Sequence, residues 1–88
     1  MILRNEYGVP QYPKGHVGRL LVALAAIDHL EQPTSSSVAK RTGLSKGKID
    51  NYVEALNSEL GTVISKTGSR YRIESWGSIL NRDAIKKL

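Results

Sequence analysis

The chain has 88 residues, of which 40% are apolar and 24% are charged. This length suits one small domain and is too short for a catalytic domain joined to a regulatory one. The composition is that of a soluble globular protein, and no apolar run is long enough to span a bilayer. The chain has no cysteine, which excludes disulfides and thiolate metal sites, and its two histidines are far apart in the sequence. We expect no metal and no cofactor.

Catalysis has no recognisable basis in the sequence. There is no phosphate-binding GxxxxGK[ST] loop, no readable pair of carboxylates and no histidine in a triad or metal motif. We therefore expect a protein that is not an enzyme. The N-terminal segment MILRNEYGVP lacks the long apolar core of a secretory signal, so we expect a cytoplasmic location.

Basic residues outnumber acidic residues by 13 to 8, which gives a net charge of +5 and a pI near 9.8. This balance suits a polyanionic partner. Two clusters of basic residues contain no acidic residue: Lys40, Arg41, Lys46 and Lys48 form the first, and Lys66, Arg70 and Arg72 form the second. Any one of them could be an ordinary solvated side chain, but their clustering favours a shared partner.

Residues 1–15 are rich in turn-forming glycine and proline, which predicts an extended arm. Tyr7 and Tyr12 of this arm would pack on the edge of the domain, with stacking on bases as the alternative. A core helix is expected next, from about His16 to Glu31. Its inward residues are Val17, Leu20, Leu21, Leu24, Ile27 and Leu30.

The opposite arc of this helix is also largely apolar. It consists of Gly18, Val22, Ala25, Ala26 and His29. A second surface should therefore cover the arc, because a monomer has little reason to expose it. The C-terminal segment and a second copy of the chain are the two candidates.

Two further helices joined by a tight turn are predicted for residues 36–60. Gly43 tolerates the positive φ that a helix C-terminus requires, and Ser45 is expected to cap the second of the two helices. The inward residues of that second helix are Ile49, Val53, Leu56 and Leu60. Its outward residues are Gly47, Asn51, Glu54 and Ser58, flanked by Lys48 and Asp50.

The periodicity changes to two residues after Gly61. Residues 62–65 and 70–74 read as two strands, and residues 66–69 read as the turn of a hairpin between them. Asn81 is a suitable cap for a short C-terminal helix.

These features resemble a known family. Ala39 at a helix crossing, Gly43 at the turn, Leu44 after the turn and Ile49 on the buried side match the helix-turn-helix of bacterial DNA-binding regulators. With the hairpin, the pattern resembles the winged helix-turn-helix domain of bacterial and phage transcriptional regulators. The resemblance implies a small α+β fold in which three helices precede a β-hairpin wing.

The resemblance also implies a division of the chain and a DNA-binding site. The arm would be residues 1–15, the winged helix residues 16–77 and the C-terminal helical segment residues 78–88. The recognition helix would present Ser45, Lys46, Gly47, Lys48, Asp50, Asn51 and Glu54 to the major groove. The DNA backbone would be contacted by Lys40 and Arg41, and the wing would contribute Lys66, Ser69, Arg70 and Arg72.

Within the recognition helix, the amide of Asn51 has the geometry to bond adenine in a bidentate manner. The carboxylates of Asp50 and Glu54 would repel phosphate unless they accept from a cytosine amino group or pair with a nearby lysine.

We therefore expect sequence-preferring binding of double-stranded DNA, used in transcriptional regulation. The alternative is a winged helix that recognises a protein, because the acidic residues on the helix would suit a basic partner. A homodimer through the first helix and the C-terminal segment is also expected, since one helix in one groove gives little specificity. Neither a membrane nor a small-molecule ligand is expected as a partner.

Overall fold

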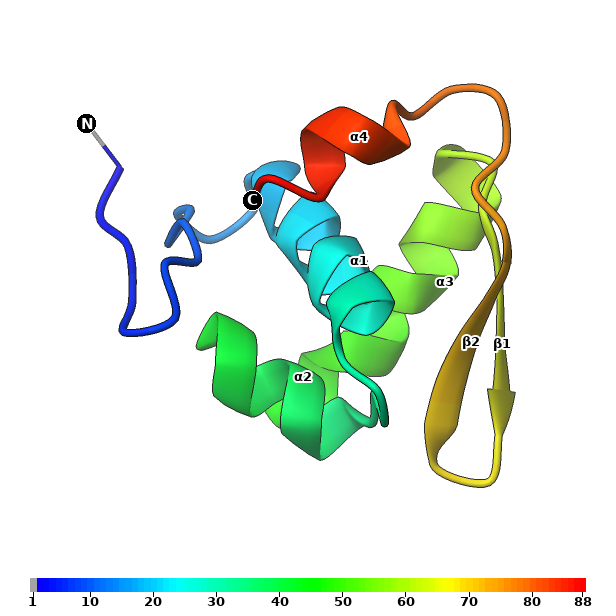
Figure 1. The fold of residues 1–88 in the computed structure, drawn as a ribbon, viewed down its shortest axis with the longest axis horizontal. Coiled ribbons are helices and arrows are strands. Elements are labelled where there is room, and N and C mark those ends of the chain that lie inside the picture. The colour runs from blue at the N-terminus through cyan, green and yellow to red at the C-terminus, as the bar shows by residue number, and fades with distance from the viewer. Residues whose placement is uncertain (1) are drawn as a thin grey trace.

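The computed structural model describes residues 2–88. It is a small α+β structure in which helices accompany one two-stranded antiparallel hairpin, as the sequence predicts at this level (Figure 1). The elements are α1 (Gly18–His29), α2 (Ser35–Thr42), a short 3-10 turn η1 (Lys46–Lys48), α3 (Ile49–Glu59), β1 (Val63–Thr67), β2 (Arg70–Ser75) and α4 (Arg82–Ile85). No helix among residues 2–88 has the length and apolar character needed to cross a membrane.

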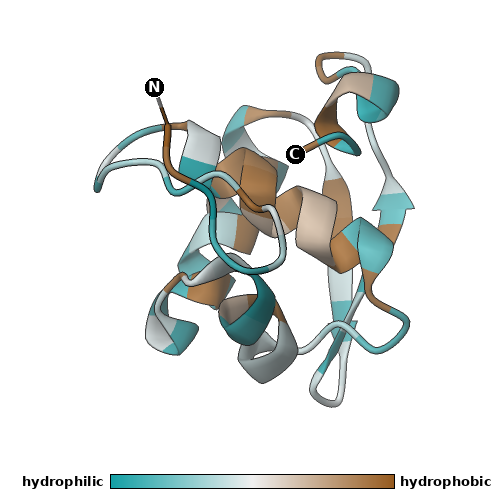
Figure 2. Ribbon diagram, turned by 60° about the vertical axis from the view of Figure 1, so that its left-hand side comes forward, coloured by the Kyte–Doolittle hydropathy of each residue, from teal (hydrophilic) through white to brown (hydrophobic). Residues whose placement is uncertain are grey.

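Helix α1 is the centre of the core, and α2, α3, α4 and the hairpin pack around it (Figure 1). Ala23 and Leu24 of α1 are fully buried. The surrounding elements contribute the buried residues Val38, Ile49, Val53, Leu56, Ile64, Tyr71 and Ile85. Figure 2 shows the apolar segments of α1 enclosed by more hydrophilic ribbon. The prediction of inward residues on α3 is thus confirmed for Ile49, Val53 and Leu56.

The second arc of α1 is covered, as expected, and the cover comes from within the chain itself. Val22 is only 2% exposed, and Ala25 and Ala26 are also buried. The small residues of this arc allow other segments of the chain to approach closely. A Cβ at Gly18 would lie 2.5 Å from the ring of Tyr12, so the N-terminal segment covers that end.

Helix α4 covers the other end of the arc, where Arg82 Nη2 lies 3.2 Å from Asp28 Oδ1. Of the two candidates for covering the apolar arc, the C-terminal segment is therefore the one observed, and the arc does not require a second copy of the chain. The burial predicted for Val17 is wrong. It was expected inside, but it is 54% exposed because α1 begins only at Gly18.

The predicted extended arm is folded back on itself. Arg4 and Pro10 form an antiparallel bridge, and Val9 is buried. The side chain of Asn5 donates to the carbonyl of Arg41 at 2.7 Å, and that of Gln11 donates to the carbonyl of Thr42 at 3.0 Å. These carbonyls belong to the last turn of α2 and have no partner within the helix. The N-terminal segment thus caps α2.

The ends of the other elements follow local chemistry. The Thr34 side chain caps α2 by accepting from the Ser37 amide, and Gly43 ends the helix with φ of +79°. The side chain of Asn81 caps α4 as expected, by accepting from the amide of Ala84 at 3.1 Å. The hairpin turn is shorter than predicted, because the strands continue through Thr67 and resume at Arg70.

The segment after β2 crosses the connection between α3 and β1 at a contact between two glycines. A Cβ at Gly77 would lie 2.3 Å from the carbonyl oxygen of Gly61, and Gly77 itself has φ of +71°. The crossing brings the C-terminal segment back over α1 (Figure 1). Only glycine allows this close passage of two backbones.

We predict that Gly77→Ala destabilises the protein by about 2 to 5 kcal/mol, because it combines a positive φ with a backbone clash. Gly8→Ala is the matched control, since Gly8 has φ of +79° but a Cβ there would meet nothing within 4 Å. Urea unfolding of the two variants separates the clash from the cost of the φ angle. Equal losses would show that the crossing at Gly77 is not tightly packed.

Candidate nucleic-acid interface

The start of α3 is basic and lacks a side-chain cap. Lys46, Gly47 and Lys48 form the 3-10 turn η1, and all three are exposed. Ser45 precedes this turn, but its side chain makes no capping hydrogen bond, so its predicted role as a cap is wrong. The reason is geometric, because the 3-10 turn is closed by the Ser45 carbonyl, which accepts from the Lys48 amide at 3.0 Å. Two exposed lysines at a helix N-terminus without a side-chain cap create a positive site.

The predicted outward face of α3 is exposed, as the periodicity indicated. Its members are Gly47, Asn51, Glu54 and Ser58. The carboxylate of Glu54 forms no ion pair with the described residues. This face can thus offer Asn51 as a hydrogen-bonding amide and Glu54 as an acceptor to a partner.

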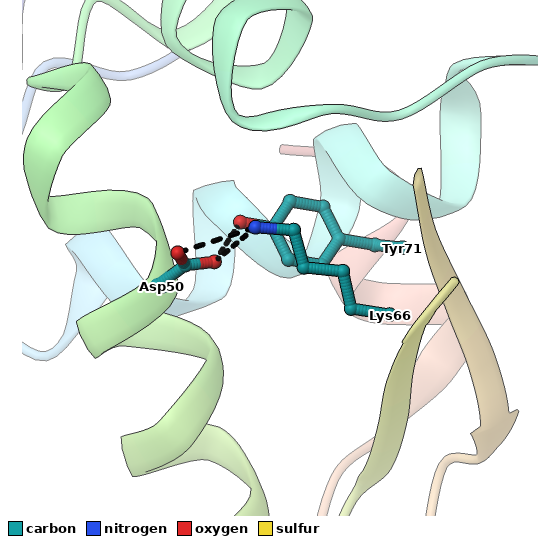
Figure 3. Close-up of polar contacts among 3 residues, drawn as sticks. All are labelled: Asp50, Lys66 and Tyr71. Carbon is teal, nitrogen blue, oxygen red and sulfur yellow. Dashed lines mark hydrogen bonds and ion pairs between the residues drawn. The ribbon is translucent and has the colours of Figure 1, made fainter. Parts of the chain in front are cut away.

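Asp50 is turned towards the hairpin and joins it to the first turn of α3 (Figure 3). Its carboxylate accepts a short hydrogen bond from the Tyr71 hydroxyl. Lys66 Nζ lies 3.2 Å from Asp50 Oδ1 and 3.3 Å from Oδ2. The same ammonium group lies 5.3 Å from the centre of the Tyr71 ring, within cation–π range. One acidic residue of α3 therefore holds one residue from each strand.

The contacts of this cluster shift the ionisation of both acidic groups. The hydrogen bond from Tyr71 lowers the pKa of Asp50, and the hydrogen bond from Lys66 lowers it further. Burial raises the pKa of Tyr71, and the bond to the Asp50 carboxylate adds to this effect. The charged form of Asp50 and the neutral form of Tyr71 are thus the forms that stabilise the attachment.

Asn57 makes a second attachment, which the sequence analysis missed. Its side-chain oxygen accepts from the Ile64 amide at 2.9 Å and from the Thr62 hydroxyl at 2.9 Å. Its side-chain nitrogen donates to the Ile64 carbonyl at 3.0 Å. The available signal was spacing, because Asn57 lies seven residues, or two turns, after Asp50 and on the same side of the helix.

The other predicted site residues differ in their exposure and in the contacts that their side chains make. Arg70 and Ser69 are exposed at the hairpin tip. The side chain of Arg72 is 78% exposed, with Nε 3.4 Å from Glu74 Oε1. Lys40 is exposed on α2, whereas Arg41 is half-buried and its guanidinium lies 5.7 Å from the centre of the Tyr7 ring.

The structure brings the start of α3 and the tip half of the hairpin together through the contact of Asp50 with Lys66. Within residues 2–88, no group of three histidine or acidic side chains could hold a metal ion. No protein-family model, curated protein or solved structure matches this chain. Its function therefore has to be inferred from the residues themselves.

We predict that Tyr71→Phe destabilises the protein by about 1 to 2 kcal/mol at neutral pH, because it removes a hydrogen bond to a charged but exposed acceptor. Tyr52→Phe is the control, since Tyr52 is half-buried and its hydroxyl has no hydrogen bond among the described residues. Urea unfolding measures both changes. A larger loss for Tyr52→Phe would contradict the importance of the Asp50 contact.

The same variant should change the response to acid. Because the folded-state pKa of Asp50 lies below its usual 3.8, the resulting stabilisation is fully present above that pH and is lost as the pH falls through the folded-state value. Carbon-detected NMR titration should show the pKa of Asp50 rising towards 3.8 in Tyr71→Phe. An unchanged pKa would show that Tyr71 is not its main determinant.

Proposed function

We propose that this protein is a winged helix that binds double-stranded DNA, with α3 as the recognition helix and the hairpin as the wing. The order of elements supports this proposal: three helices, with Gly43 and Leu44 between the second and third, precede the hairpin. The positions that carry the resemblance also have suitable environments. Ile49 is buried, Ala39 is half-buried beside the core, and Gly43 has a positive φ.

The observation that carries the proposal is the joining of two basic, exposed surfaces. The first is the uncapped start of α3 with Lys46 and Lys48, and the second is the hairpin tip with Arg70. Helix N-termini and basic side chains both favour phosphate groups. Because Asp50 ties α3 to Lys66 of the hairpin, the two surfaces can engage one polyanion together.

The proposed roles follow from exposure and chemistry. Lys46, Lys48, Lys40 and Arg70 would contact phosphates, with Arg72 as a further contact after release from Glu74. Asn51 would read a base edge in the major groove, and Gly47 would allow close approach of the helix. Half-buried Arg41 is a weaker candidate, because its guanidinium lies on the Tyr7 ring.

Protein recognition is the second candidate. It is favoured by Glu54, an exposed carboxylate beside Asn51 on the outward face of α3. A basic protein segment could pair with Glu54, whereas a phosphate would be repelled by it. In DNA binding, the same carboxylate would have to accept from a cytosine amino group.

Transcriptional regulation is the proposed use of DNA binding. A homodimer would place two recognition helices on a two-fold DNA site and enlarge the small interface of one module. Its interface is not the apolar arc of α1, because that arc is buried within the chain.

We predict that affinity for duplex DNA of random sequence falls steeply with salt, because each neutralised phosphate contributes about 0.9 to the slope of log K against log salt. Fluorescence anisotropy at several salt concentrations measures this slope. Binding that does not respond to salt would contradict an interface made by these basic residues. Absence of duplex binding at low salt would favour the protein partner.

We predict that the wing and the helix differ in their contributions. Arg70→Ala should weaken binding to all duplexes alike, since a phosphate contact carries no sequence information. Asn51→Ala should instead reduce discrimination among sequences by about 1 to 3 kcal/mol. Selection from a randomised duplex pool, followed by titration of the preferred site, compares the two. An unchanged ranking for Asn51→Ala would show that α3 does not read the bases.

A further inference from the structure

Lys66 differs from the other basic residues of the hairpin in what its charge already contacts. Its ammonium group lies within 3.3 Å of both carboxylate oxygens of Asp50 and over the Tyr71 ring. Its side chain is 38% exposed, which is about half the exposure of Arg72. Among the basic residues of the hairpin, Lys66 is thus the one whose charge is paired with an acidic residue of α3.

The Asp50 carboxylate is held in place although Asp50 is itself exposed. The Tyr71 hydroxyl donates to it, and Tyr71 is 4% exposed with its backbone amide bonded to the Pro33 carbonyl at 2.8 Å. A carboxylate fixed by a buried tyrosine loses less side-chain entropy when it pairs with a lysine than a free one does. This fixation favours a persistent pair between Asp50 and Lys66.

We propose that Asp50 is a positioning residue for DNA binding, whose carboxylate takes the place of a DNA phosphate at Lys66 and keeps that lysine out of the phosphate contacts. This inference rests on the proposed function. Lys66 then sets the position of the wing against the first turn of α3, while Arg70 remains available to DNA and Arg72 becomes available on release from Glu74. The carboxylate of Asp50 is correspondingly a structural contact and does not read a base.

The Asp50 carboxylate opposes the approach of a phosphate to Lys66. The phosphate would be repelled by the negative charge of Asp50, and it would have to displace a carboxylate that Tyr71 also holds in place. Replacing the carboxylate with an amide removes the repulsion and frees the ammonium group. Asp50→Asn keeps a side-chain oxygen that can accept from the Tyr71 hydroxyl, so the wing should keep its place.

A double-mutant cycle on the salt dependence of duplex binding tests this inference. The proteins are the unmodified chain, Lys66→Met, Asp50→Asn and the double variant, each titrated with one random duplex. One phosphate contact corresponds to about 0.9 in the slope, or about a 3.5-fold change in the ratio of Kd values at 200 mM and 50 mM salt. We expect Lys66→Met to leave the slope of the unmodified protein unchanged and to lower it by about 0.9 in the Asp50→Asn background.

Glu54→Gln is the matched control, because it removes another exposed carboxylate of α3 that has no ion pair with the described residues. We expect Lys66→Met to have no effect in the Glu54→Gln background, so general removal of negative charge is separated from release of Lys66.

Two results would overturn the inference and leave the proposed function intact. The first is a slope lowered by about 0.9 when Lys66→Met is made in the unmodified protein, which would make Lys66 a direct contact. The second is no effect of Lys66→Met in either background, which would show that Asp50 is not what excludes it. Failure of the unmodified protein to bind any duplex would instead remove the proposed function itself, and the inference with it.

Discussion

The attachment of the hairpin to α3 is the contact on which the arrangement of this protein depends. A two-stranded hairpin is marginally stable in water by itself, so it needs a surface to pack on. Helix α3 provides that surface with two polar side chains separated by two turns, or about 10 Å. Asn57 holds the start of β1 through Ile64, and Asp50 holds the tip half of the hairpin through Tyr71 and Lys66.

Between these two attachments the contact is apolar. Val53 of α3, Ile64 of β1 and Tyr71 of β2 are all buried, and Ile64 and Tyr71 lie on the same side of the hairpin. The opposite side carries Arg70 and Arg72, which face solvent. The alternation along the strands therefore separates the residues that fix the hairpin from the residues that could bind an anion.

The sequence predicted the parts of this structure that depend on local periodicity. The wheel of α3 identified its buried residues, and the two-residue alternation identified β2. Prediction failed where the outcome depends on distant segments. The wheel of α1 showed a second apolar arc correctly, but it could not decide between the C-terminal segment and a second copy as its cover, and it did not indicate that Tyr12 would cover one end.

The candidate site shows the same limit. Lys66 was expected to be a DNA contact because it belongs to a basic cluster, and Asp50 was expected on the DNA-facing side of its helix. The two residues are 16 positions apart, and no local pattern indicates that they pair. The missing cap at Ser45 is a smaller case, since a serine before a helix can close a 3-10 turn with its backbone in place of its side chain.

The central claim is that the start of α3 and the hairpin tip together bind duplex DNA. Mapping of backbone amide NMR shifts during addition of a random duplex at low salt tests it most directly. The account predicts the largest changes at residues 46–51 and 69–72, with little change at Arg82 of α4 or at Lys86 directly after it, which are basic but lie elsewhere in the fold. Changes centred on α4 or the N-terminal segment, or no change at all, would contradict it.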